Sequence, residues 1–212
     1  MAPVRPPPSI SAMGISARQF AELEERSRRR GSRADAATPV RKTGLTDTVI
    51  IGVDPSLRGT GYGVIRVGRD RHQVLAEGTI KCPADWAHSR CLLKIATELR
   101  DVIGRTQPTI CAVEGVFFAQ NLKTAIIMGA ARGAALVALA EGGVEIYEIA
   151  TRKVKQAIVG YGGAQKSAVA KMVQRMLDLP APPAPDAADA LALALTYAHE
   201  HGRVQLKPRK QI

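Results

Sequence analysis

The sequence predicts an α/β fold in which one mixed five-stranded sheet is flanked by helices, between a basic N-terminal extension and a short basic tail. Two observations lead to this prediction. Three strand-like segments follow one another through short turns, as in an antiparallel meander. The rest of the chain alternates apolar strand-like runs with helical patterns, which is the order produced when helices cross over into parallel strands. We therefore expect a three-stranded antiparallel meander plus two parallel strands in one sheet.

Each element has a local signal. The strand segments are rich in valine, isoleucine and tyrosine, the helices carry apolar residues at helical spacing, and one helix ends at a glycine pair. The strands are expected at Thr48–Val53, Tyr62–Val67, Gln73–Ile80, Thr109–Glu114 and Val144–Ala150. The helices are expected at Trp86–Ile103, Leu122–Ala140, Thr151–Val159, Gln165–Leu177 and Asp186–Glu200. One apolar face of the first helix is expected to contain Leu93, Ala96, Leu99 and Ile103.

The charge of the chain favours a polyanionic partner. Among 212 residues there are 30 Lys and Arg against 19 Asp and Glu, a net charge of +11, which is typical of proteins that associate with nucleic acid. Residues 48–202 carry 17 basic and 14 acidic residues, so if the body of the protein binds nucleic acid, it must do so through a local patch. We interpret residues 1–46 as a disordered Pro/Arg-rich extension, 47–202 as the folded domain and 203–212 as a basic tail.

Cysteine usage and hydropathy restrict the environment. Cys82, Cys91 and Cys111 are an odd number without CxxC spacing, which favours a reducing compartment over a disulfide framework or a zinc site. We see no apolar run that approaches the roughly 20 residues of a membrane span and no hydrophobic signal-peptide region. No membrane partner is expected.

Two acids stand where strands end. Asp54 and Glu114 close segments that we expect to be parallel neighbours, about 4.8 Å apart, at one edge of the sheet. Taken singly, Asp54 suits a turn before proline and Glu114 is an ordinary strand-end acid. Taken together, two adjacent carboxylates repel unless positive charge lies between them, and Mg²⁺ is a cation that prefers such oxygen ligands.

The closing helix contributes two more acids, Asp186 and Asp189, whose i, i+3 spacing places them on one helical face. On their own they are explained by capping or by the helix dipole, since Pro185 suits the first helical position. Four carboxylates at the ends of elements that can meet, in a chain that favours a polyanion, fit a two-metal phosphodiester hydrolase.

Several motifs, in order, resemble the RuvC family of Holliday junction resolvases: "IIGVDPSLRGTGYGVI", "AVEGVFFAQN", "ARGAALVA", "VKQAIVGYGGAQKSAV" and "DAADALALAL". The resemblance covers about residues 48–200. It implies a ribonuclease H-like fold and a homodimer that cuts two opposing strands of a four-way DNA junction symmetrically, in recombination and repair. It also implies two Mg²⁺ per active site, with Mn²⁺ able to substitute, a bacterial cytoplasmic, nucleoid-associated location, and a branch-migration helicase complex as a further partner.

The resemblance assigns the metals and catalysis to Asp54, Glu114, Asp186 and Asp189. By the same resemblance, Phe117 stacks on or wedges against a base near the crossover, and Lys155 and Lys166 face the DNA backbone and the active site. Arg152, one helical turn before Lys155, extends that basic face. Without the motifs, the two lysines would be taken as solvated surface residues and Phe117 as a core residue.

Three positions depart from the family pattern. Ser56 stands where glycine is usual after "DP", Gly115 replaces a commoner polar residue, and Gln120 stands where lysine is frequent. The substitution at Gln120 removes one possible phosphate contact.

Two other functions remain as alternatives. "GVDPSLRGTGYGV" also looks like the first phosphate loop of actin-like ATPases and sugar kinases, but those proteins have about twice this length and a second glycine-rich adenosine motif, which we do not find. A catalytically silent junction-binding module is the other alternative, and the presence of all four acids argues against it.

Overall fold

A computed structural model of the chain describes residues 45–115 and 121–201, all within one compact unit that spans residues 43–212. Its sheet has five strands in the order β3-β2-β1-β4-β5. The strands are β1 (Val49–Asp54), β2 (Gly59–Arg66), β3 (Gln73–Lys81), β4 (Ile110–Gly115) and β5 (Glu145–Ala150). β1–β2 and β2–β3 pair antiparallel, and β1–β4 and β4–β5 pair parallel. This is the predicted mixed sheet.

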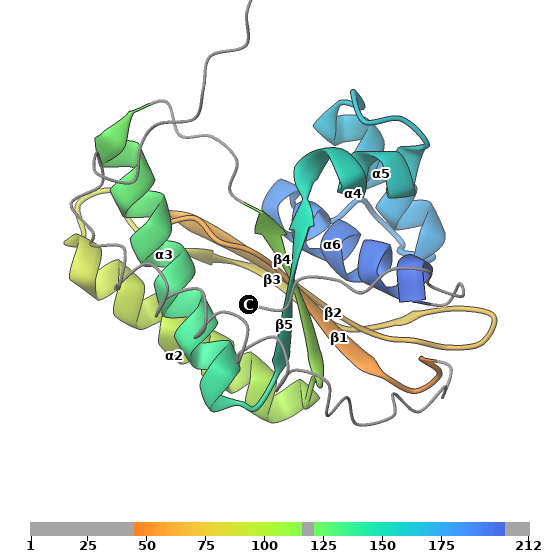
Figure 1. Cartoon of the computed structure of the whole chain (residues 1–212), viewed down its shortest axis with the longest axis horizontal. Coiled ribbons are helices and arrows are strands. Elements are labelled where there is room, and N and C mark those ends of the chain that lie inside the picture. Colours follow the sequence, from red (N-terminus) through yellow and green to blue (C-terminus); the bar gives the residue numbers. More distant parts are fainter. Residues whose placement is uncertain (1–44, 116–120, 202–212) are drawn as a thin grey trace, which may run out of the picture. The chain divides into compact units, whose positions relative to one another are not determined.

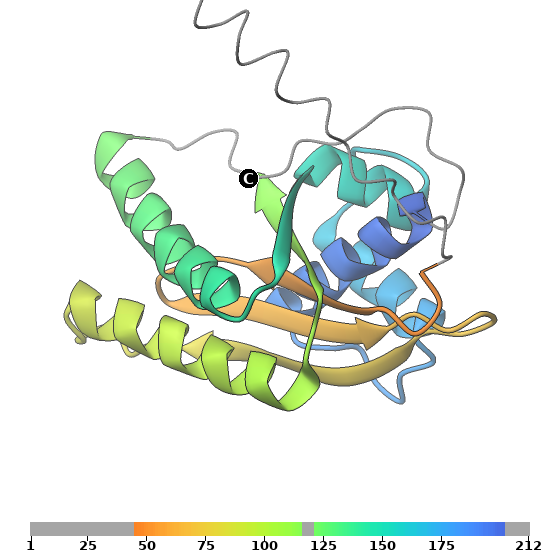
Figure 2. The same cartoon turned by 60° about the horizontal axis from the view of Figure 1, so that its bottom comes forward.

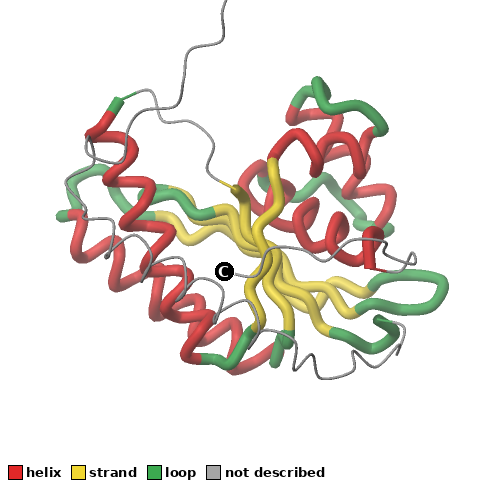
Figure 3. Tube along the Cα trace, viewed as in Figure 1, coloured by secondary structure: helices red, strands yellow, loops and turns green. Residues whose placement is uncertain are grey.

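Helices cover both faces of the sheet (Figure 1). α2 (His88–Thr106) and α3 (Leu122–Glu141) lie on one face and also connect β3 to β4 and β4 to β5. α4 (Thr151–Val159), α5 (Lys166–Met176) and α6 (Pro185–His201) lie on the other face. The rotated view in Figure 2 and the tube in Figure 3 show the same three layers.

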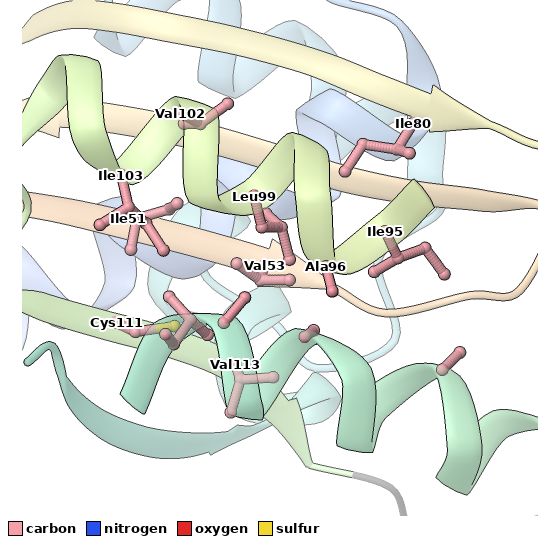
Figure 4. Packing of buried hydrophobic residues seen from close by; sticks show 14 of the residues in the cluster. Ile51, Val53, Ile80, Ile95, Ala96, Leu99, Val102, Ile103, Cys111 and Val113 are labelled. Atoms are coloured by element: carbon pink, nitrogen blue, oxygen red, sulfur yellow. The ribbon is translucent and has the colours of Figure 1, made fainter. Parts of the chain in front are cut away.

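The alternation of side chains along β1 and β4 decides which face each residue meets. Ile51 and Val53 of β1 and Cys111 and Val113 of β4 belong to the core cluster beneath α2 and α3 (Figure 4). Ile50 and Ala112 belong instead to the cluster beneath α4, α5 and α6. Because side chains two residues apart share a face, Asp54 and Glu114 project toward α4–α6.

Glycines let α6 lie directly on the sheet. A Cβ added at Gly52 would overlap the backbone carbonyl of Ala190, and one added at Gly61 would overlap the carbonyl of Asp186. α6 is apolar enough to be buried there: Ala187, Ala188 and every residue from 190 to 198 are buried. The glycines of β1 and β2 therefore set the height at which α6 carries its two acids.

The turn after Asp54 differs from expectation in its length. β2 begins at Gly59, which pairs with Lys81 of β3, and not at Tyr62, so the turn is restricted to residues 55–58. The start of β2 was not predicted because glycine has a low strand propensity. The close approach of α6 nevertheless requires glycine at Gly61. Ser56 needs no glycine-like backbone, because it is absent from the described non-glycine residues with positive φ. Its backbone N–H donates to the buried Thr60 hydroxyl at 3.2 Å, and that hydroxyl donates to the Ser56 carbonyl at 2.6 Å.

The predicted apolar face of α2 is wrong in one residue. Leu93 is 65% exposed, whereas the buried residues of this helix are Cys91, Ile95, Ala96, Leu99, Val102 and Ile103.

The expectation that no segment could cross a membrane also needs correction. Among the described residues one helix, α3, is long and apolar enough by length and composition, with 22% of its apolar window buried. In the fold α3 packs against α2 and β5.

Candidate active site

A small cavity opens at the carboxyl ends of β1 and β4, against α4, α5 and α6. Its volume is about 80 Å³, and three acids and two lysines contribute to its wall. The lining residues are Asp54, Glu114, Thr151, Val154, Lys155, Lys166, Val169, Asp189 and Leu193. Side chains from five elements meet here. β1 and β4 end at this edge, α4 and α5 begin near it, and α6 contributes Asp189 and Leu193.

Asp54 and Glu114 lie side by side as the strand order predicts. The last β1–β4 pair is Val53 with Val113, so each acid stands one residue beyond this ladder, while Asp54 still pairs with β2 and Glu114 with β5. Burial, and then the neighbouring Glu114 carboxylate, raise the pKa of Asp54 from its ordinary 3.8 to about 7. The surroundings therefore disfavour the ionised form of Asp54, which a nearby cation would favour.

Asp189 is brought to the same cavity by α6 and contacts Lys166, the first residue of α5. The Lys166 Nζ lies 2.6 Å from Asp189 Oδ2, with side chains 73% and 22% exposed. This hydrogen bond, together with the charges of Asp189, Asp54 and Glu114, raises the pKa of Lys166. Lys166 is thus the cation that partly offsets the three carboxylates.

Asp186 lies apart from this group. It is in the first turn of α6, where its charge also favours the helix dipole. Its carboxylate is close to Gly59, and it does not line the cavity.

The residues expected to contact DNA do not all lie at the cavity. Lys155 and Lys166 line the cavity. Arg152 is exposed outside it, and its side chain lies against Gly162 in the loop after α4. Phe117 and Gln120 lie outside the described residues, so the expectations for them stay predictions.

Two residues that we did not single out from the sequence contact Glu114. The Thr151 hydroxyl donates to Glu114 Oε1 at 2.6 Å, and an Arg132 Nη1 donates to the Glu114 backbone carbonyl. Thr151 directly follows β5, whose end pairs with the end of β4, so the topology alone placed it near this edge. Arg132 lies within the motif "ARGAALVA", but we assigned no role to it from the sequence.

The donor set fits a hard divalent cation, although the acids are not gathered as a preformed cage. Within residues 45–115 and 121–201, no group of three or more His, Cys, Asp or Glu side chains is arranged to hold a metal ion. The reason is visible in the contacts: Asp189 is engaged by Lys166, and Asp186 lies outside the cavity. The ligands on offer are nonetheless carboxylate oxygens with excess negative charge, as Mg²⁺ and Mn²⁺ prefer.

Comparison with known proteins identifies one family. Residues 50–197 match the family model of the crossover junction endodeoxyribonuclease RuvC. The chain is 45% identical to RuvC of Bordetella avium over 150 residues, which cover 71% of this chain and 83% of that protein. It is 46% identical to RuvC of Shewanella amazonensis over 154 residues, 72% of this chain and 88% of that one.

Solved structures show the same likeness. The structure of Thermus thermophilus RuvC in complex with Holliday junction substrate superposes with a TM-score of 0.67 at 37% identity, covering 71% of this chain and 93% of that chain. The five-stranded ribonuclease H-like fold is therefore confirmed. Over its folded domain, this chain belongs to the RuvC family of crossover junction endodeoxyribonucleases.

Proposed function

We propose that this protein resolves four-way Holliday junctions by hydrolysing phosphodiester bonds in two opposing DNA strands during recombination and repair. The observation that carries the proposal is the convergence of Asp54, Glu114 and Asp189 on one cavity in a member of this family. Lys155 and Lys166 in the same wall suit the phosphates that flank a cleaved bond.

The size of the cavity indicates how the substrate lies. About 80 Å³ is well below the roughly 300–1,000 Å³ of small-molecule pockets. A phosphate can therefore approach the mouth, while the sugar and base remain outside, along the exposed side of α4 and α5. This geometry supports a nuclease over the alternative of an ATP-binding domain, which needs an enclosed nucleotide site.

The reaction we propose depends on two Mg²⁺ ions, which Mn²⁺ can replace. Asp54, Glu114, Asp186 and Asp189 would hold them, and when bound the metals supply an activated water and stabilisation of the leaving oxygen. Asp54 would contribute most, because burial and then the neighbouring Glu114 carboxylate raise its pKa, and a bound cation would stabilise its ionised form against both effects. If Asp189 held a metal through Oδ2, its 2.6 Å contact with Lys166 would open, and the Lys166 ammonium would become available to a phosphate.

A homodimer would provide the second active site that symmetric cleavage requires. α3 presents apolar residues to solvent: Leu122, Ile126 and Val137 are 77%, 63% and 53% exposed. Their spacing of four and eleven residues places them on one helical face. Among the described residues, none lies within 4 Å of a Cβ added at Gly129 or Gly133 of the same helix, which leaves room for close approach. We propose that a second copy of this chain covers the face.

Other partners follow from family membership. We propose that Phe117 stacks on a junction base, that Arg152 extends the basic face of Lys155, and that a branch-migration helicase complex acts on the same junction. A cytoplasmic, nucleoid-associated location agrees with Cys82, Cys91 and Cys111, which are buried free thiols.

The decisive experiment is cleavage of a labelled four-way junction, with a linear duplex of the same sequence as the control. We expect Mg²⁺-dependent symmetric cuts in the junction alone. Asp54→Asn should bind the junction in EDTA with unchanged affinity and should not cleave it. Normal cleavage by this variant would refute the mechanism, and tight ATP binding in calorimetry would favour the nucleotide-binding alternative.

A further inference from the structure

Glu114 is held at two points by side chains from two helices. Thr151, the first residue of α4, donates its hydroxyl hydrogen to Glu114 Oε1 at 2.6 Å. Arg132, in the middle of α3, donates to the backbone carbonyl of Glu114. We propose that Thr151 and Arg132 are positioning residues that fix Glu114 for catalysis, an inference that rests on the metal-dependent function proposed above.

Glu114 needs such support because strand pairing ends before it on one side. The β1–β4 register stops at Val53 and Val113, so nothing in that ladder holds Glu114 against Asp54. When both acids are ionised they repel, and a free glutamate side chain would rotate away from its neighbour. A hydroxyl donor on Oε1 opposes that rotation, since a hydrogen bond to a charged carboxylate is among the stronger side-chain contacts.

Arg132 acts on the backbone that carries the carboxylate. Besides the Glu114 carbonyl, its guanidinium contacts Glu148 of β5, with Nη2 3.4 Å from Oε2 and side chains 14% and 31% exposed. One planar group thus links the end of β4 to β5 from the α3 side of the sheet. A lysine ammonium is a single point charge and cannot contact the Glu114 carbonyl and the Glu148 carboxylate with the fixed geometry of a guanidinium.

The two contacts come from opposite faces of the sheet. α3 lies on the α2 side and α4 on the α6 side (Figures 1 and 2). Arg132 therefore restrains the main chain of Glu114, and Thr151 restrains its side chain. The two contacts together fix the orientation of the carboxylate. Partners of this kind behind a metal-binding carboxylate typically change metal affinity or activity by about 10–100-fold when removed.

Thr151 gives the cleaner test, because it is exposed and we expect its substitution to leave the fold intact. The variants are Thr151→Val, which keeps the shape and removes the donor, and Thr151→Ser, which keeps the donor. Thr106→Val is the matched control, because the Thr106 hydroxyl donates to the Val102 carbonyl at 2.7 Å, far from the site. Three quantities are measured: the single-turnover rate of junction cleavage, the Kd for the junction in EDTA, and the affinity for Mg²⁺ alone by calorimetry.

We expect Thr151→Val to lower the cleavage rate and the Mg²⁺ affinity by about tenfold or more, with the junction Kd unchanged within about twofold. Thr151→Ser and Thr106→Val should stay within about threefold of the wild type. The inference is overturned if Thr151→Val cleaves and binds Mg²⁺ like the wild type, or if Thr151→Ser is as impaired as Thr151→Val. Failure of the wild type itself to cleave or bind Mg²⁺ would refute the proposed function, and the inference with it.

Arg132→Lys tests the second contact, with Arg100→Lys as its control, because Arg100 forms an exposed ion pair with Glu141 at 2.6 Å. Arg132→Lys should lower the cleavage rate about tenfold while the junction Kd is retained, and Arg100→Lys should change neither. Equal cleavage rates for the two variants would remove Arg132 from the proposal.

Discussion

The most informative perturbation is Asp54→Asn, because it separates the effect of the active-site charge on the stability of the fold from its effect on catalysis. Asparagine keeps the size of the side chain and is neutral at every pH. In the wild type, burial and Glu114 raise the pKa of Asp54 from 3.8 to about 7. The folded protein therefore holds a proton on this acid over a pH range in which the unfolded chain has released it.

The sign and size of the effect follow from proton linkage. For an acid whose pKa is raised by folding, the free energy of unfolding falls as pH rises between the two pKa values and is fully lowered above the folded one. A change from 3.8 to about 7 corresponds to at most about 4 kcal/mol. At pH 8 the metal-free variant should thus be more stable than the wild type by up to that amount. Near pH 4 the difference should be small, because Asp54 is then protonated in the folded chain and close to half protonated in the unfolded chain, where its pKa is 3.8.

The assay is urea unfolding in EDTA across pH 4–8, with Asp70→Asn, which removes an exposed hairpin acid, as the control. Asp70→Asn should follow the wild type at each pH. Mg²⁺ should then stabilise the wild type at pH 8 and stabilise Asp54→Asn less. A difference between Asp54→Asn and the wild type that does not depend on pH would refute the reasoning about charge at this site.

Three further predictions concern neighbouring features. Lys166→Met removes the cation that engages Asp189, so Mg²⁺ measured by calorimetry should bind several-fold more tightly while junction cleavage falls; weaker Mg²⁺ binding would contradict this. Gly52→Ala forces a Cβ into the carbonyl of Ala190 and should destabilise the fold by about 3 kcal/mol in urea. Gly104→Ala, a helical glycine with open space around it, should be neutral or slightly stabilising. Val137→Glu places a charge on the exposed face of α3 and should shift the protein from dimer to monomer in sedimentation, whereas the exposed Gln73→Glu should not; a dimeric Val137→Glu would place the interface elsewhere.

The order and pairing of the elements could be predicted from the sequence. Hydrophobic periodicity distinguishes strands from helices, and the crossover rule makes β1 and β4 parallel neighbours. The adjacency of Asp54 and Glu114 followed from those two steps. The start of β2 did not, because Gly59 and Gly61 have low strand propensity and are present for the sake of the α6 backbone above them.

The contacts within the site depended on tertiary structure. Asp186 and Asp189 share a helical face in the sequence, yet only Asp189 lines the cavity, because the height and direction of α6 depend on where its backbone rests on the glycines. The helical pattern of α2 likewise included Leu93, which points to solvent because no element covers that side of the helix among the described residues.

The sequence by itself determined which chemical groups this protein offers: four carboxylates and a set of lysines at the ends of predictable elements. Beyond the adjacency of Asp54 and Glu114, only the folded chain decided which groups meet: Lys166 engages Asp189, and Thr151 and Arg132 hold Glu114. The physical reason is that periodicity reports burial along one element, whereas a contact depends on the separation and angle between elements far apart in the chain.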